Sequence, residues 1–341
     1  MACSSSIAIL AGRRLSFLDH LVPLCHLMDM PLLCTDRWVF MAAEHFYPET
    51  KLILADEDNF EEIVSHYQTL YTVEPCRLHP FAFRFGEYLY RGEAQTVCGF
   101  HGNSDKYRTR YWIERYVDED VVLFYGQHFI DFLIEKGVWS RVKKGVFIGN
   151  LRLQFYQRHK DFFDKIIQPH LFPKGEDKVI LYAPTWSFLG SCDDSPFFEM
   201  LPSVLDQIPK GFRVMVKLHP YSFNFFPEKV AQIKERYNQH EQIFFLDEVP
   251  LVYPLLDHAD IFLGDYSSVG YDFLAFNKPL FFLGDKKGAL QKVGVVVEDF
   301  SKLYQILDRK DEYGQKRRTL YEYAYGPPRP FDNIREELNQ V

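Results

Sequence analysis

The segment ADIFLGDYSSVGYDFLAFNKPLFF, residues 259–282, decides the fold because it reads as strand, turn, helix and strand in succession. Asp265 ends the first strand, and Ser267 and Ser268 lie where the helix begins. Serine is a favourable N-cap, since its hydroxyl accepts an otherwise unpaired backbone N–H. The free amides, that of Val269 included, and the helix dipole make this turn a predicted anion site. Plain capping of a buried helix is the alternative.

The alternation of strand and helix extends outward from this segment. The second half predicts strands at residues 179–183, 213–218, 243–246, 260–263 and 280–283, and helices at 197–207, 228–237, 252–258, 269–276 and 300–307. The first half predicts strands at residues 7–11, 31–34, 52–55, 96–100, 121–125 and 146–148. Helical spacing covers residues 15–28, where Pro23 argues against one continuous helix. Such alternation is typical of parallel sheets with helices on both faces, so the predicted fold class is α/β.

The length of 341 residues suits two domains of roughly 150 residues each. The segment QPHLFPKGEDK, residues 168–178, combines prolines, a glycine and charges, which favours an exposed connector. We therefore expect a first domain over residues 1–172 and a second over residues 173–325. Residues 326–341 open with a proline-rich turn and end in a predicted helix that could cross back to the first domain.

Composition argues against several function classes. A net charge of −8 disfavours a general nucleic-acid binder, which needs a basic face for phosphates. The six cysteines show neither a CxxC pair nor zinc-type spacing with histidine, so we expect free thiols in a cytoplasmic protein without a metal or other cofactor. No stretch reaches ~18 uninterrupted apolar residues, so no membrane span is expected. Peripheral contact with a membrane surface stays open.

Two more strands of the second half end in polar residues. The run FRVMVKLHPYS, residues 212–222, brings Lys217 to its strand end, and the following proline holds His219 extended near the same rim as the serine turn. The run VILYAPTWS, residues 179–187, ends at Thr185, whose hydroxyl could contact a base, ribose or phosphate. A structural histidine and a packed strand end are the respective alternatives.

One strand of the first half carries a comparable signal. The run TVCGFHGNSDK, residues 96–106, ends at His101 and Gly102. A histidine at a strand end is a candidate general base because its ordinary pKa lies near neutrality. Glycine permits close approach of a ligand to the backbone, and Lys106 could neutralise a phosphate. A packed or solvated histidine beside a polar turn is the alternative.

Together these segments resemble the CDP-glycerol glycerophosphotransferase family. DYSSVGYDFLAFNKPLFF resembles the family's DYSS-x-x-x-D segment ending in K-P, KLHPY its K-L-H-P strand end, and YAPTW its Y-A-P-T-W strand. The family's H-G-T-P-L-K appears as HGNSDK, and its G-x-P-R-x-D appears as GNLRLQ, residues 149–154, with Arg152 at the arginine position. The likeness is specific over residues 179–282 and thin before residue 96.

The resemblance implies a GT-B fold, in which two Rossmann-like domains face each other across a cleft. It implies CDP-glycerol or a similar CDP-alditol as donor and CMP as leaving group. The acceptors it implies are teichoic-acid-type polymers or their lipid-linked primers, at the inner face of the cell membrane. His101 and His219 correspond to the family's essential histidines, and Ser267 and Ser268 to serines at the donor phosphates. The predicted donor side comprises Thr185, Lys217, Asp265, Ser267, Ser268 and Val269, and the acceptor or phosphate side Gly102, Lys106 and Arg152.

The predicted reaction is metal-independent: His101 deprotonates the acceptor hydroxyl, while His219 and the serine turn hold the pyrophosphate. Two departures concern the acceptor side. HGNSDK places Asp105 near the predicted base, and GNLRLQ lacks the family's proline and aspartate. Two alternatives stay open. A GT-B glycosyltransferase that uses a nucleotide sugar needs the same pyrophosphate site, and a catalytically inactive nucleotide-binding protein would keep only the donor domain.

Overall fold

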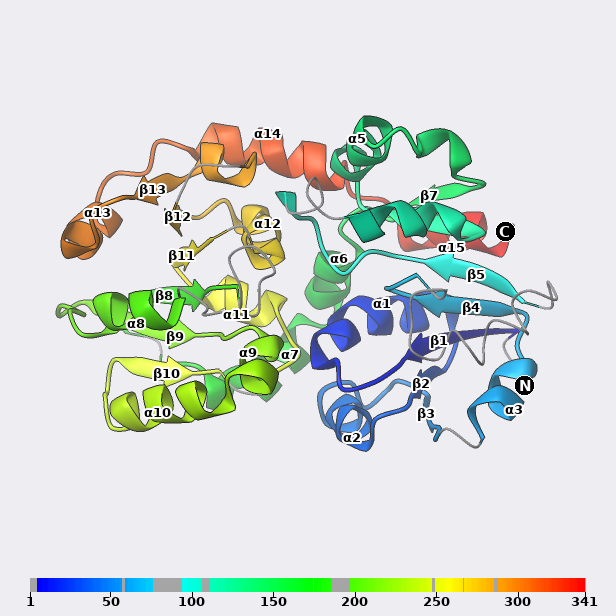
Figure 1. Ribbon diagram of the computed structural model, residues 1–341, viewed down its shortest axis with the longest axis horizontal. Coiled ribbons are helices and arrows are strands. Elements are labelled where there is room, and N and C mark those ends of the chain that lie inside the picture. Colours follow the sequence, from blue (N-terminus) through cyan, green and yellow to red (C-terminus); the bar gives the residue numbers. More distant parts are fainter. Residues whose placement is uncertain are drawn as a thin grey trace. The chain divides into compact units, whose positions relative to one another are not determined.

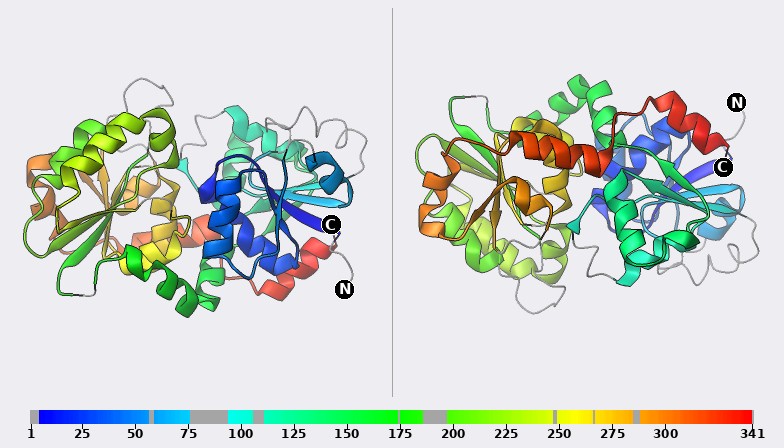
Figure 2. Two further views of the ribbon diagram at one scale, coloured as in Figure 1. Left: turned by 90° about the horizontal axis from the view of Figure 1, so that it is seen from below. Right: turned by 90° about the horizontal axis from the view of Figure 1, so that it is seen from above.

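The computed structural model of the protein describes residues 5–56, 59–75, 94–105, 111–173, 175–185, 197–246, 249–265, 267–284 and 288–340. The chain divides into unit 1, Met1–Arg158 with Glu322–Val341, and unit 2, His159–Tyr321. Each unit has one parallel sheet with helices on both of its faces (Figures 1 and 2). The domain boundary expected after residue 172 concerns where the chain can be separated, and it stays a prediction.

The described part of unit 1 forms a seven-stranded sheet in the order β3-β2-β1-β4-β5-β6-β7. Its strands are β1 (Ser6–Leu10), β2 (Leu32–Cys34), β3 (Leu52–Leu54), β4 (Thr69–Thr72), β5 (Gln95–Cys98), β6 (Val121–Phe124) and β7 (Gly145–Phe147). Its helices are η1 (Leu15–Phe17), α1 (Leu18–Met28), α2 (Arg37–Phe46), α3 (Phe60–Ser65), η4 (Tyr111–Asp118), α5 (Gln127–Glu135), η5 (Trp139–Arg141), α6 (Leu151–Arg158) and α15 (Phe331–Asn339). In β1, which pairs with β2 and β4, Ala8 lies opposite Leu32 on one side and Tyr71 on the other.

The described part of unit 2 forms a six-stranded sheet in the order β10-β9-β8-β11-β12-β13. Its strands are β8 (Lys178–Ala183), β9 (Phe212–Val216), β10 (Ile243–Phe245), β11 (Ile261–Gly264), β12 (Leu280–Leu283) and β13 (Val295–Val297). Its helices are α7 (Lys160–Ile167), η6 (Gln168–His170), α8 (Phe197–Leu205), α9 (Pro220–Phe225), α10 (Pro227–Tyr237), α11 (Tyr253–His258), α12 (Ser268–Phe273), η7 (Leu274–Phe276), η8 (Leu290–Val293), η9 (Phe300–Lys302) and α13 (Leu303–Leu307). Helix α14 (Gly314–Tyr325) begins in unit 2 and ends in unit 1.

The predicted strands are all present, and the predicted α/β class with parallel sheets is confirmed. Two further strands, β4 and β13, complete the sheets and are not predicted from the sequence. The run predicted over residues 15–28 is divided into η1 and α1 and is not one continuous helix, but the division does not lie at Pro23, which is inside the continuous α1. Its buried face, which includes Leu18 and Leu21, outweighs the backbone hydrogen bond that proline removes.

Three of the cysteines, Cys25, Cys34 and Cys98, are buried free thiols, and the other three lie outside the described residues. Burial raises the pKa of Cys34 to about 12 and raises that of Cys25 as well. These thiols are therefore unreactive packing groups at neutral pH. None of the described helices is long and apolar enough to cross a bilayer.

A buried arginine joins α14 to the turn before β12. Arg317 is 1% exposed, and its Nη1 lies 2.8 Å from the Asp311 carboxylate. Its Nε lies 3.2 Å from the side-chain oxygen of Asn277, and its Nη2 lies 3.0 Å from the backbone oxygen of the same residue. Asn277 has a left-handed φ of 51°, so the arginine holds a backbone corner that asparagine tolerates better than most residues.

We predict that Arg317→Ala destabilises unit 2 by about 3 kcal/mol, because it leaves Asp311 and the Asn277 corner without their shared partner. The matched control is Arg318→Ala, which removes the next, exposed arginine and should cost less than about 0.5 kcal/mol. Urea unfolding followed by circular dichroism measures both. Equal stability of the two variants would contradict the assigned role.

Candidate functional site

Both sheets contain a switch point, where the strand order reverses between β1 and β4 in unit 1 and between β8 and β11 in unit 2. In open α/β sheets, ligands bind outside the carboxyl ends of the strands at such points. We call residues 184, 185, 217–219, 265, 267 and 268 the β8–β11 rim, and residues 11–17, 73–75 and 100–105 the β1–β4 rim. The predicted site residues fall largely in these two sets, and each rim is described within its own unit.

Thr185 and Asp265 connect the two central strand ends of the β8–β11 rim. The backbone N–H of Thr185 donates to Asp265 Oδ2 at 2.9 Å, and its hydroxyl donates to the same oxygen at 2.6 Å. Both side chains are buried. The second carboxylate oxygen, Oδ1, is also buried and has no hydrogen-bond partner within the described residues. Thr185 can therefore offer a ligand only the lone pairs of its hydroxyl oxygen, because its hydrogen is already donated.

The serine turn has the predicted capping geometry. Ser267 is the N-cap of α12 with φ −67° and ψ 146°, and Ser268 is the first helical residue. The Ser267 hydroxyl oxygen accepts from the amide of Val269 at 3.3 Å, which is long for such a bond. A Cβ on Gly270 would lie 2.7 Å from a Leu290 methyl group, so glycine here allows α12 to pack closely. The turn is thus fixed in place, while the hydrogen bond from the Val269 N–H to the Ser267 hydroxyl stays weak.

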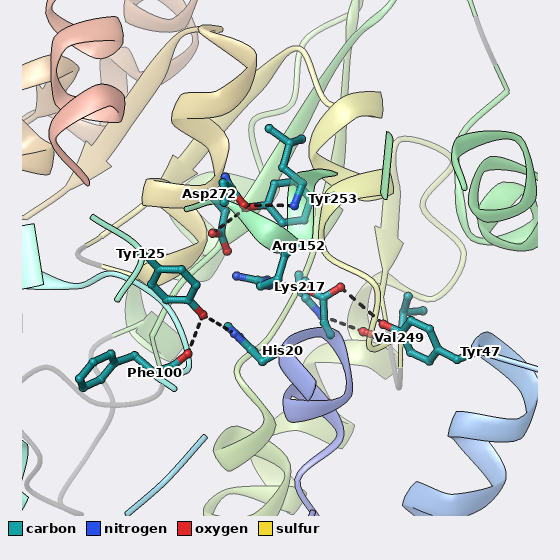
Figure 3. Close-up of polar contacts among 12 residues, drawn as sticks. His20, Tyr47, Phe100, Tyr125, Arg152, Lys217, Val249, Tyr253 and Asp272 are labelled. Atoms are coloured by element: carbon teal, nitrogen blue, oxygen red, sulfur yellow. Dashed lines mark hydrogen bonds and ion pairs between the residues drawn. The ribbon is translucent and has the colours of Figure 1, made fainter. Parts of the chain in front are cut away.

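Lys217 and His219 follow β9 at the same rim. Lys217 Nζ donates to the carbonyl oxygen of Val249 at 3.0 Å (Figure 3). His219 is the N-cap of α9 in extended backbone conformation, as predicted from the proline that follows it, and its Nδ1 accepts from the Tyr221 amide at 3.1 Å. Because Nδ1 accepts, the hydrogen of the neutral ring lies on Nε2. His219 therefore presents an N–H donor, which suits contact with a phosphate oxygen.

Two residues of the DYSS segment that sequence reasoning did not assign to the site support it structurally. The hydroxyl of Tyr253 donates to Asp272 Oδ1 at 3.1 Å, and both side chains are buried (Figure 3). Lys278 Nζ donates to the carbonyl oxygens of Asp257 and Ala259, at 2.7 and 2.8 Å. These carbonyls end α11, so Lys278 caps that helix and holds it beside the strand that leads into the serine turn.

His101 lies at the β1–β4 rim, partly buried, and its ring centroid is 5.4 Å from that of Phe17. Burial lowers the pKa of His101 below its ordinary value, while the Glu74 carboxylate and a hydrogen bond to the Val73 backbone oppose that shift. Glu74 forms an ion pair with Arg14. The ring is therefore held neutral beside a compensated pair of charges, which is the state that a general base requires.

The residues after His101 anchor the loop. Gly102 has φ 115°, a conformation that side-chain-bearing residues rarely adopt. Asn103 is fully buried, and its amide donates to the Ala324 carbonyl at 3.1 Å. Asp105 Oδ1 lies 3.8 Å from Nε2 of His128. The departures from H-G-T-P-L-K thus have structural contacts within unit 1, and Lys106 lies outside the described residues.

Arg152, the predicted acceptor-side arginine, is buried in an ion pair. Its Nε donates to Asp19 Oδ2 at 2.8 Å, and Nη2 donates to the same oxygen. The hydroxyl of Tyr47 lies 3.5 Å from the other oxygen of Asp19. Arg152 is 4% exposed, so the structure assigns it a structural contact to α1, and its contact with substrate stays a prediction.

Sequence reasoning missed the side chains of α1 and β6 that lie around this rim. Figure 3 shows Tyr125 with its hydroxyl between Nδ1 of His20, at 2.9 Å, and the backbone oxygen of Phe100, at 2.6 Å. His20 lies in a run that reads as the apolar face of a helix, and its partner is 105 residues away. No local signal identifies such a pair. The helix that follows the first strand at a switch point is the one feature that could have drawn attention to it.

Comparison with known proteins adds independent information. The sequence pattern of the family described as CDP-Glycerol:Poly(glycerophosphate) glycerophosphotransferase matches residues 152–323. The teichoic acid glycerol-phosphate primase of Bacillus subtilis (strain 168) is 35% identical over 123 residues, which are 35% of this chain and 29% of the primase. The chain thus spans less than a third of the length of that relative.

Several solved structures share the fold. A variant of the wall teichoic acid polymerase TagF matches with a TM-score of 0.65 and 15% identity over 99% of this chain and 90% of the polymerase chain. A TagF variant soaked with CDPG matches with a TM-score of 0.63 and 13% identity over 99% and 89%. The UDP-GlcNAc 2-epimerase of Methanocaldococcus jannaschii matches with a TM-score of 0.58 and 11% identity over 98% of this chain and 100% of the epimerase chain. The sequence identities are too low to indicate a shared function. The structural similarity confirms the predicted GT-B-like α/β fold.

Proposed function

The chain belongs to the CDP-glycerol:poly(glycerophosphate) glycerophosphotransferase family, a family of transferases, and on that premise we propose that it transfers an alditol phosphate, glycerol phosphate in the first place, from a CDP-activated donor to a hydroxyl acceptor. CMP is the second product. The observation that carries this proposal is that the matched residues 152–323 include every residue of the β8–β11 rim. The TagF structure soaked with CDPG supports the choice of donor.

In this proposal the β8–β11 rim holds the donor pyrophosphate. His219 donates from Nε2, and Lys217 supplies positive charge from the same strand end. Ser267 and Ser268 contribute their hydroxyls at the start of α12. The N–H of Val269, whose hydrogen bond to Ser267 is long, can donate to a phosphate oxygen instead. Phosphoryl transfer leaves the protein mainly to position groups and to neutralise charge, and these groups do both.

His101 acts as the general base on the acceptor hydroxyl. As the hydroxyl oxygen bonds to the alditol-bearing phosphorus, its proton passes to His101. The bond between that phosphorus and the bridging oxygen breaks, and the electron pair leaves with CMP. The lowered pKa of His101 keeps the ring unprotonated near neutral pH, so it is ready to accept the proton.

The acceptor belongs to the teichoic-acid class, as a lipid-linked primer or a growing polymer. The similarity to the Bacillus subtilis primase supports this part of the proposal. A lipid-linked acceptor would bring the protein to a membrane surface on its cytoplasmic side. Arg152 then acts on the acceptor side through Asp19 and α1, and not by direct contact with a phosphate.

The donor is tested by incubating the protein with labelled CDP-glycerol, CDP-ribitol and common UDP-sugars, with and without lipid-linked acceptors. We expect CMP release from a CDP-alditol and no UDP release from any sugar nucleotide, because the matched family is defined by a CDP-glycerol donor. Release of UDP would favour a glycosyltransferase. Binding of CDP-glycerol without turnover on any acceptor would favour an inactive nucleotide-binding protein.

Replacing both Ser267 and Ser268 by alanine should weaken CDP-glycerol binding about tenfold, since two hydroxyl contacts to the phosphates are lost. The fold should survive, because loss of an N-cap costs about 1 kcal/mol. Isothermal titration calorimetry measures the affinity. Ser301→Ala, at an exposed position of unit 2, is the matched control. CDP-glycerol binding as tight as in the wild type would show that these serines do not form the donor site.

His101→Ala should lower kcat by about 10²–10⁴-fold and leave the CDP-glycerol affinity nearly unchanged. His219→Ala should weaken donor binding as well as turnover, because its proposed contacts include the phosphates. His240→Ala, at an exposed position, is the control and should change neither. Lost thermal stability in both variants, without a selective kinetic effect, would assign the two rings to packing.

The pH profile provides a second readout for His101. Because its pKa is lowered, the base form persists into more acidic solution, and the acid limb of kcat/KM should lie below about pH 6.5. His101→Ala should remove this limb from the residual activity. An acid limb at or above pH 6.5 would indicate a different base.

A further inference from the structure

His20 lies next to the β1–β4 rim although no motif marks it. It is buried on α1, three residues after Phe17, and residues three apart share one face of a helix. The ring of Phe17 packs against that of His101, with centroids 5.4 Å apart. His20 therefore faces the side of α1 on which the predicted base lies.

The hydroxyl of Tyr125 determines which nitrogen of His20 carries the hydrogen. Tyr125 Oη lies 2.6 Å from the carbonyl oxygen of Phe100 and 2.9 Å from Nδ1 of His20 (Figure 3). A carbonyl oxygen can only accept, so the single phenolic hydrogen is donated to Phe100. Nδ1 of His20 must therefore donate its own hydrogen to the tyrosine oxygen.

The ring of His20 is neutral in these surroundings. Burial, and then the guanidinium of Arg152 and the neighbouring ring of His101, lower the pKa of His20 well below its ordinary value. A neutral imidazole with its hydrogen on Nδ1 carries a lone pair on Nε2. Within the described part of the chain, no group donates a hydrogen bond to that nitrogen.

We propose that Nε2 of His20 binds a hydroxyl group of a polyol acceptor by accepting its hydrogen bond. A lone pair requires a hydrogen donor, which a hydroxyl provides and an ionised phosphate does not. The guanidinium of Arg152 disfavours an ammonium ligand at the same place. The inference rests on the proposed function and deepens it, because it assigns a second hydroxyl of the acceptor to a residue beside the predicted base.

Tyr125 is the positioning residue of this arrangement. It fixes the tautomer of His20 and, through the Phe100 carbonyl, the backbone one residue before His101. Asp19, the neighbour of His20 on α1, is held by the buried Arg152. The first turn of α1 is thus attached on two sides, so the direction of the His20 ring is set before any ligand arrives.

Nuclear magnetic resonance tests the site without requiring turnover. Long-range ¹H–¹⁵N spectra of the full-length protein at neutral pH report the tautomer, and His20→Gln identifies the signal by its absence. We expect a hydrogen on Nδ1 and a shift of the Nε2 resonance on addition of glycerol 3-phosphate. Ethyl phosphate, which has a phosphate but no alcohol hydroxyl, should cause no such shift. A hydrogen on Nε2, equal shifts with both compounds, or no shift with glycerol 3-phosphate would each overturn the proposal.

Two variants separate ligand contact from positioning. His20→Asn keeps an amide N–H within reach of Tyr125 and removes the acceptor at Nε2, whereas His20→Gln places an amide oxygen near the Nε2 position. The acceptor kcat/KM should fall about tenfold in His20→Asn and largely recover in His20→Gln, with CDP-glycerol affinity unchanged in both. His26→Asn, on the same helix, is the matched control. The opposite result would be a normal acceptor kcat/KM in His20→Asn and a reduced one in His20→Gln, with an equal reduction in Tyr125→Phe. It would show that His20 only positions the loop.

The two proposals fail in different ways. Absence of CMP release by the wild-type protein counts against the proposed transfer reaction. The resonance experiment uses glycerol 3-phosphate alone and decides the His20 site by itself.

Discussion

Parallel strand pairing is the constraint on which the rest of this structure depends. In a parallel sheet every strand points the same way, so the loops that follow the strands gather along one edge. Thr185 and Asp265 are 80 residues apart in sequence, yet their strands are neighbours and their side chains meet at 2.6 Å. His219 and Ser267 follow strands of the same sheet. The strand order brings these groups to one rim, and local capping then fixes their directions.

Local chemistry made much of this predictable, as the residues themselves show. The buried run at β8 and the serine cap at α12 follow from apolar character and from hydroxyl hydrogen bonding within three residues. The strand β4 carries threonines among its apolar residues and so gives no clear apolar run, and the three valines of β13 are not recognised as a strand. The pairs His20–Tyr125 and Asp19–Arg152 join residues more than a hundred positions apart. Contacts of this kind depend on the completed fold, and the periodicity of apolar residues in the sequence does not predict them.

Recognisable motif residues divide into those that face the rim and those that hold it. Lys278 belongs to the K-P end of the DYSS segment, yet it caps α11 by donating to two backbone oxygens, and burial lowers its pKa. Asp272 is held by the Tyr253 hydroxyl in the interior. The unusual Asn103 has a comparable role, since it binds the backbone of Ala324. Divergence of a motif therefore does not by itself mean loss of the site, because part of each motif serves the scaffold.

The buried pair of Asp19 and Arg152 also bears on how this chain can change over generations. Removing either partner strands a charge in the interior, whereas replacing both by apolar residues of similar size removes the problem altogether. A single substitution at either position is consequently destabilising, so the two positions are expected to evolve as a coupled pair. Among descendants of this sequence, position 19 and position 152 should change together or remain unchanged. Retention of this pair also keeps the direction of α1 and the orientation of the His20 ring, which follows Asp19 on that helix.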